Sequence, residues 1–201
     1  MRTVTGLFDD YDDARDAVRE LGGAGVPSDD ISIVANNTGD RYSTDDSDAG
    51  EGAATGAGLG AAGGGVVGLL TGLGLMAIPG VGPVVAAGWL AATAAGAAAG
   101  AVAGGAAGGL IGALTDSGVD EEDAHVYAEG VRRGGTLVTA RVDDTLAPEA
   151  EAILQDRNRV DPAARRGIFA QEGWTRFDDN ADPYTLEQVQ RERERYRSMM
   201  P

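Results

Sequence analysis

The chain has 201 residues, of which 32 are acidic and 16 basic, and its net charge at pH 7 is −16. It contains no cysteine, which excludes disulfides and thiolate chemistry. A surface of this charge repels nucleic-acid phosphates and anionic lipid headgroups at long range, so we expect no nucleic-acid partner.

Residues 1–51 predict the first half of an α/β domain followed by an acidic linker. Residues 3–8 form a short β-rich run, and Asp9 or Asp10 is placed to cap a helix. That helix has an apolar face at Ala14, Ala17, Val18 and Leu21. Residues 30–35 predict a second strand, and residues 36–51 are polar and rich in turn formers. No apolar stretch typical of a secretory signal follows Met1, so we expect the acidic parts to be cytoplasmic.

Residues 52–115 contain no Asp, Glu, Lys, Arg or His, and we predict that they form a long antiparallel helical hairpin. The predicted turn consists of Pro79, Gly80, Gly82 and Pro83. It separates arms of 26 residues (53–78) and 31 residues (84–114). At 1.5 Å per residue these arms are roughly 39 and 46 Å long, against about 30 Å of bilayer hydrocarbon. Either arm is therefore long enough to span a membrane.

Glycines recur at every fourth position on both arms, which is typical of a glycine zipper that lets another helix approach closely. The predicted packing residues are Gly56, Gly60, Gly64, Gly68, Gly72, Gly88, Gly96, Gly100, Gly104, Gly108 and Gly112. We infer tight hairpin packing and self-association from this spacing.

The environment of the hairpin stays open between three alternatives. The leading one is a hairpin in the cell inner membrane with the rest of the chain in the cytoplasm. The second is a water-soluble, cytoplasmic homo-oligomer that buries the arms, and the third is a low-complexity segment that orders only with a partner. Nine glycines in the first arm cost a water-exposed helix about 9 kcal/mol relative to alanine, which favours burial. The acidic flanks on both sides argue against insertion.

Residues 116–162 predict the second half of the α/β domain. The pattern indicates a helix over 119–133 capped near Asp120, a strand over 136–142, a helix that Pro148 opens and a short strand near Val160. Together with the first half, this order predicts an α+β, ferredoxin-like sheet whose middle connection contains the hairpin.

Residues 163–201 predict a tail with a charged helix over 185–200. Its aromatic residues Trp174, Phe177 and Tyr184 are candidate anchors. The run of alternating charges at 191–197 favours a solvated helical face over a binding patch. We expect this helix to dock weakly or to stay disordered.

No constellation in the sequence predicts a catalytic residue, a cofactor site or a metal site. His125 is the only histidine, and its place on a helix favours a packing or surface role. Residues 58–63 match G-x-G-x-x-G but follow an acidic linker instead of a strand, so a nucleotide site is not predicted. The acidic clusters at 9–13 and 45–48 lack a calcium-binding loop pattern, which favours helix capping and solvation.

The segments GLFDDYDDARDAVRELGGAGVPSDDISIVAN and VDEEDAHVYAEGVRRGGTLVTARVDD, with a Gly/Ala-rich block between them, resemble the bacterial general stress protein 17M-like (heat-induced stress protein) family. This resemblance implies a non-enzymatic role in stress adaptation. It leaves three hypotheses: a membrane-associated stress protein, a soluble homo-oligomeric stress protein, and a module that senses a small ligand or ion. The sequence identifies no such small molecule.

Overall fold

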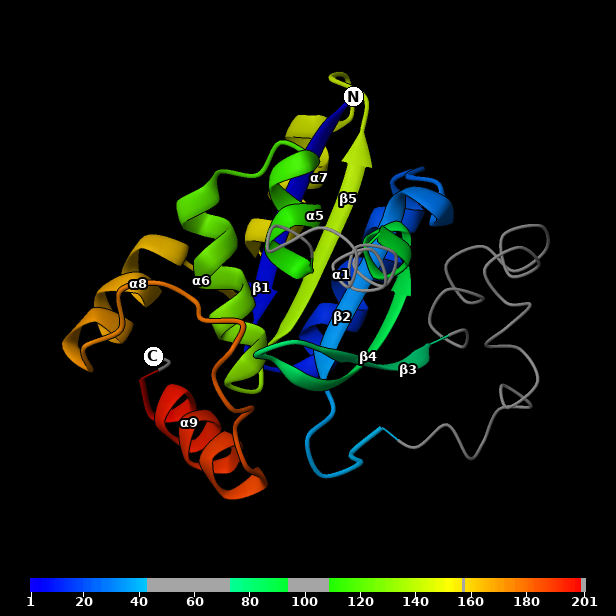
Figure 1. The fold of residues 1–201 in the computed structure, drawn as a ribbon. Helices are drawn as coiled ribbons and strands as arrows, with labels where there is room; N and C mark the ends of the chain where they lie inside the picture. Colours follow the sequence, from blue (N-terminus) through cyan, green and yellow to red (C-terminus); the bar gives the residue numbers. More distant parts are fainter. Residues whose placement is uncertain (43–72, 94–108, 157, 200–201) are drawn as a thin grey trace.

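A computed structural model describes residues 1–42, 73–93, 109–156 and 158–199. These residues form a six-stranded antiparallel sheet in the order β3-β4-β2-β5-β1-β6 (Figure 1). The strands are β1 (Arg2–Phe8), β2 (Ile31–Asn36), β3 (Gly74–Ile78), β4 (Gly82–Gly88), β5 (Thr136–Val142) and β6 (Arg159–Val160). The helices are α1 (Tyr11–Gly23), the 3₁₀ turn η1 (Ser28–Asp30), α5 (Leu110–Asp116), α6 (Glu121–Arg132), α7 (Ala147–Asp156), α8 (Pro162–Gln171) and α9 (Leu186–Met199).

The α+β class predicted from the sequence is confirmed. The helix caps also lie where the sequence predicts them. The Asp10 carboxylate accepts a hydrogen bond from the backbone N–H of Asp12 at the start of α1, and the Asp120 carboxylate accepts one from the backbone N–H of Glu122 at the start of α6. When the β3–β4 hairpin and the helices α5 and α6 between β2 and β5 are set aside, the remaining connectivity β1-α1-β2-β5-α7-β6 is that of a split βαβ fold. The ferredoxin-like label for this arrangement stays a prediction.

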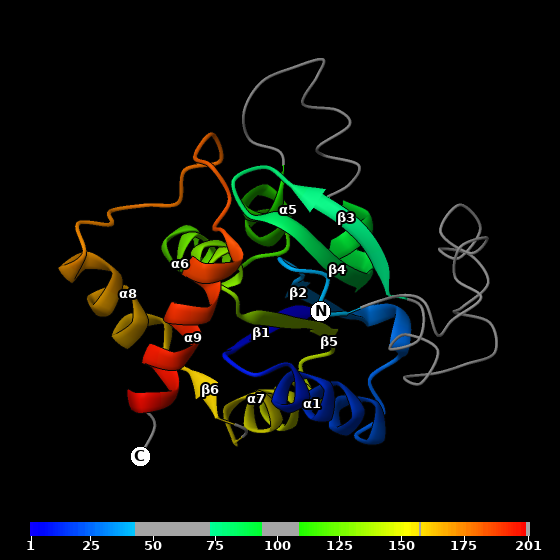
Figure 2. The same ribbon diagram turned by 90° about the horizontal axis from the view of Figure 1, so that it is seen from below.

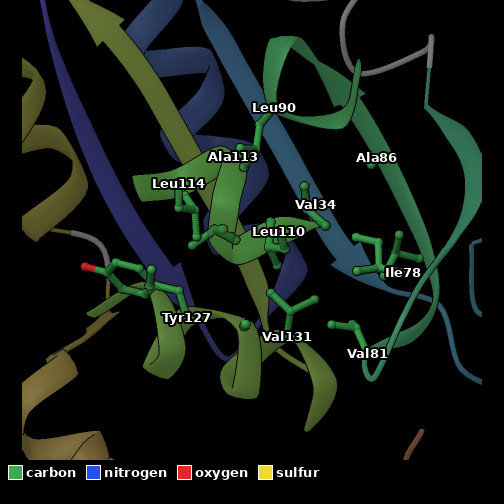
Figure 3. Close-up of a cluster of buried hydrophobic side chains, with 14 of the residues drawn as sticks. Val34, Ile78, Val81, Ala86, Leu90, Leu110, Ala113, Leu114, Tyr127 and Val131 are labelled. Atoms are coloured by element: carbon green, nitrogen blue, oxygen red, sulfur yellow. The ribbon is translucent and has the colours of Figure 1, made fainter. Parts of the chain in front are cut away.

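The sheet is covered on both faces, as Figure 2 shows. Helices α1 and α7 pack on one face, where Phe8, Leu21 and Ile33 belong to one apolar cluster. Helices α5 and α6 pack on the other face, where Leu114, Tyr127 and Val131 belong to the same apolar cluster as the strand residue Val34 (Figure 3). Neighbouring residues of β1 enter different clusters: Leu7 belongs to the cluster under α5 and α6, and Phe8 to the cluster under α1 and α7. This is the two-residue period of a strand.

The predicted pair of continuous helices over 53–78 and 84–114 is wrong. Residues 74–78 and 82–88 are the strands β3 and β4, which form a β-hairpin, and β4 pairs with β2. The physical reason is that β4 satisfies the backbone groups of β2, which would otherwise end the sheet, while Ile78 and Val84 enter the core. The alternating exposure along β3 is the period of a strand.

Part of the uncharged block packs into the core of the domain. Leu90 and Leu114 are buried in the same cluster, and only 15 residues, 94–108, separate the described segments. Residues 43–72, which connect β2 to β3 of the same sheet, number 30. Among the described residues, no helix is both long enough and apolar enough to span a membrane.

The C-terminal tail packs firmly against the domain, unlike the weakly docked or disordered tail that we expected. Val189 and Tyr196 of α9 are buried, and so is Phe177 in the segment before it. The tip of the β3–β4 hairpin meets this segment so closely that a side chain on Gly80 would strike the backbone of Asp178. Helix α8, which the sequence did not predict, packs against α6, and both α8 and α9 lie on the α6 side (Figure 2).

Candidate functional site: a polar cleft at the free edge of β1

A cleft of about 280 Å³ opens beside β1, between α6 and α7. Its origin is the short strand β6, which pairs with β1 only at Leu7 and Phe8 and leaves the edge of residues 2–6 without a strand partner on that side. Thr3, Val4 and Thr5 line the cleft from β1. The remaining lining residues come from the α5–α6 connection, α6, α7 and β6: Gly118, Val119, Asp120, Asp123, Tyr127, Glu151, Leu154, Gln155 and Arg159.

Two buried polar atoms of the cleft lack a hydrogen-bond partner among the described residues. They are the hydroxyl oxygen Oγ1 of Thr5 and the guanidinium Nε of Arg159. A buried polar atom without a partner costs about 1–3 kcal/mol, so native proteins rarely leave one without a reason. Both atoms belong to residues that line the same cleft, and nine further buried side-chain atoms among the described residues also lack a partner. The pair therefore makes the lining of this cleft polar.

Tyr127 and Arg159 interact within the cleft. Burial raises the pKa of the Tyr127 hydroxyl, and the positive charge of Arg159 opposes that rise. Tyr127 therefore stays a neutral phenol at physiological pH. The described residues show no ion pair for Arg159, so its positive charge is available to a ligand.

Three carboxylates line the same cleft, and each has a partner elsewhere. Asp123 pairs with Arg166 at 2.9 Å, Glu151 pairs with Arg2 at 3.5 Å, and Asp120 caps α6. The Arg2–Glu151 pair is more than 40% exposed on both side chains, so water screens it and a competing cation can replace it. The cleft thus offers one cationic group and several acidic groups to a ligand.

A buried network of charged and aromatic residues supports α6 at its other end. The Arg133 guanidinium, only 5% exposed, donates to Glu129 at 2.7 Å, to Glu172 at 2.5 Å and to Glu192 at 3.2 Å. It also lies 4.2 Å from the ring centre of Phe169. Burial alone would lower the pKa of Arg133, but the hydrogen bond and charge of Glu129 outweigh burial and raise it. These contacts join α6 to α8 and α9.

A second buried pair joins α8 to the end of β1. The Arg165 guanidinium donates two hydrogen bonds to the two carboxylate oxygens of Asp9, at 2.9 and 2.6 Å, and both side chains are less than 10% exposed. The Arg165 guanidinium also lies 3.7 Å from the ring centre of Tyr196 on α9. These groups are used in holding the helices together, so we assign them a structural role.

His125 lies on α6 with its side chain 11% exposed, and Nδ1 has no hydrogen-bond partner among the described residues. Burial lowers its pKa below 6.5, the positive charge of Arg176 lowers it further, and Glu121 raises it. The folded protein therefore holds the proton less tightly than the unfolded chain.

We expect the ring of His125 to titrate with a midpoint below 6.5 in the folded protein, and Arg176→Gln to move that midpoint upward. Because the folded pKa lies below the unfolded value, the free energy of unfolding should fall as the pH drops from 6.5 toward the folded pKa. An NMR titration is unambiguous, since the chain has one histidine. A midpoint at or above 6.5 would contradict the burial of His125.

The predicted site residues fall mostly outside the described part of the chain. This holds for Gly56, Gly60, Gly64, Gly68 and Gly72, and for Gly96, Gly100, Gly104 and Gly108. Gly112 lies in α5, and Gly88 ends β4 with φ of +89°. Pro79 and Gly80 lie in the turn between β3 and β4, and Gly82 and Pro83 begin β4.

The cleft was not predicted from the sequence, because its lining residues span positions 3 to 159. One local signal was present, because the strand at 159–160 is too short to pair with the whole of β1. Nothing in the sequence placed Asp123 of α6 and Glu151 of α7 in the same cleft. Within the described residues, no group of three or more His, Asp or Glu side chains is arranged to hold a metal ion.

The fold and the cleft define an α+β protein with an antiparallel sheet and a polar cleft beside β1. Residues 3–78 match the family model described as the heat induced stress protein YflT domain, which confirms over these residues the resemblance stated from the sequence. No curated protein and no solved structure matches the chain.

Proposed function

We propose that this chain is a non-enzymatic stress-response protein that binds a small polar ligand in the cleft beside β1. The observation that carries this proposal is the polar lining of the cleft, in which Arg159 has no ion pair among the described residues and in which Thr5 Oγ1 and Arg159 Nε have no hydrogen-bond partner there. A ligand that bonds to these atoms would satisfy them and stabilise the folded state. The YflT match supports the stress-response part of the proposal.

The non-enzymatic part rests on where the reactive groups lie. The lone histidine is not among the residues that line the cleft. The buried carboxylates of Glu129 and Asp9 are held by arginines. The cleft itself offers Tyr127 as a neutral phenol, with its pKa raised by burial, and this does not favour a general base at neutral pH.

A thermal-shift screen tests the proposal, using amino acids, amines, carboxylates, nucleotides and divalent cations. A compound present at about 100 times its Kd should raise the free energy of unfolding by about 2.7 kcal/mol. We expect at least one class to stabilise the parent chain and the Arg19→Gln control, but not Arg159→Gln. Arg19 is a suitable control because it pairs with Asp16 on α1, away from the cleft. If no compound stabilises the protein, or if Arg159→Gln responds equally, the cleft is not a binding site.

Self-association stays a prediction from the sequence. One described feature is compatible with it: β3 ends the sheet, carries no charge, and exposes 57% of Leu75. An uncharged edge strand offers unpaired backbone groups to another chain. The mass of the purified protein in solution, measured by light scattering, decides between monomer and oligomer.

A further inference from the structure

We propose that the cleft selects a small zwitterion, a molecule that carries a carboxylate at one end and an ammonium group at the other. This inference rests on the proposed binding function and specifies the class of ligand. It follows from the two signs of charge that the lining residues present.

The carboxylate of the ligand would meet Arg159 and Thr5. Arg159 supplies the positive charge and an unused Nε donor, and Thr5 supplies an unused hydroxyl. Guanidinium groups bind carboxylates strongly, because their N–H groups match the two carboxylate oxygens in geometry. Tyr127 lines the cleft beside Arg159 and adds a neutral hydroxyl to this end of the lining.

The ammonium end would meet the carboxylates on the two walls of the cleft. Glu151 stands on α7, while Asp120 and Asp123 stand at the start of α6. Glu151 is the most available of the three, because its pair with Arg2 is long and exposed. Acidic groups from two separate helices thus oppose the single arginine on β6.

Ligands with a single sign of charge fit this lining less well. A simple anion would meet Arg159 but would also be repelled by three carboxylates and by a chain of net charge −16. A simple cation would meet the carboxylates but leave Arg159 Nε and Thr5 Oγ1 unpartnered. A zwitterion satisfies both ends and adds no net charge.

Three probes of matched size separate these cases: 4-aminobutanoate, butanoate and butylammonium. The readout is the change in backbone amide NMR signals of Thr3, Thr5 and Asp123 during titration of the full chain. We expect 4-aminobutanoate to shift these signals at concentrations at least about tenfold lower than either single-charge probe, which corresponds to about 1.4 kcal/mol. Equal or tighter binding of butanoate or butylammonium would overturn the zwitterion assignment, as would no shift with any probe.

Two variants test the two ends separately. Arg159→Gln and Glu151→Gln should each weaken 4-aminobutanoate binding about tenfold, whereas Arg19→Gln should leave it within about twofold. Arg159→Gln should also remove the advantage over butylammonium, and Glu151→Gln the advantage over butanoate. Unchanged selectivity in folded variants would contradict the inference. If the broad screen finds a ligand that Arg159→Gln abolishes but the zwitterion is not preferred, the binding function stands and only the ligand class fails.

Discussion

Replacing Arg133 with methionine is expected to lower the free energy of unfolding by about 3–5 kcal/mol, because it leaves a buried carboxylate without its main partner. Glu129 is 1% exposed, and Arg133 is its closest cation at 2.7 Å. Arg132 lies farther away, at 3.5 Å, and cannot fully take over this role. The measurement is urea denaturation of the parent chain and the variant at pH 7.

The matched control is the double variant Glu129→Met, Arg133→Met. Replacing both partners of a buried ion pair by apolar side chains is often neutral or stabilising, so the double variant should recover much of the stability that the single variant loses. The parent chain should also protect α9 from proteolysis, whereas Arg133→Met should expose it, because the contact to Glu192 is lost. If the single variant unfolds at the same urea concentration as the parent chain, the network is not needed for the fold.

Replacing Gly88 with alanine is expected to lower the free energy of unfolding by about 2–6 kcal/mol. Its φ of +89° costs an alanine about 1–3 kcal/mol, and crowding adds a similar amount. The new methyl group would lie 2.8 Å from the Ser32 Cα atom and closer still to the Ile31 carbonyl oxygen, both on the neighbouring strand β2. Backbone atoms of a central strand cannot move aside cheaply.

Gly25→Ala separates the two contributions. Gly25 has a similar φ of +95°, but nothing lies within 4 Å of the added methyl group, so only the conformational cost applies. If Gly88 lay in a solvent-exposed helix, Gly88→Ala would instead raise the free energy of unfolding, because alanine stabilises such a helix by about 1 kcal/mol relative to glycine. Chemical denaturation of both variants therefore distinguishes the strand from the helix that the fourfold glycine spacing predicts. A stabilised Gly88→Ala chain would contradict the β4–β2 pairing.

Local patterns predicted the elements whose periodicity agrees with their tertiary surroundings. The strand over 136–142 and the helix that Asp120 caps were found from alternation, apolar spacing and capping residues. In these segments the apolar pattern, the cap and the packing all favour the same structure.

The segment around the Pro-Gly-Val-Gly-Pro turn shows where local patterns were not enough. Its glycine spacing resembles a helical ridge, whereas the need of β2 for a backbone partner makes residues 82–88 a strand. That need arises only once the sheet exists. The C-terminal helix was misjudged for a similar reason, since the partners of Glu192 and Arg193 lie about 59 residues away on the chain.

The sequence by itself determined the α+β class, most helix and strand positions outside the uncharged block, and the family resemblance, because these depend on side-chain periodicity and caps within a few residues. Only the tertiary structure decided that the uncharged block extends the sheet, that α8 and α9 are held by buried ion pairs, and that Thr5, Glu151 and Arg159 line one cleft. Each of these depends on which distant segments lie side by side, and that is set by the pairing of backbone groups and the burial of charges across the whole fold.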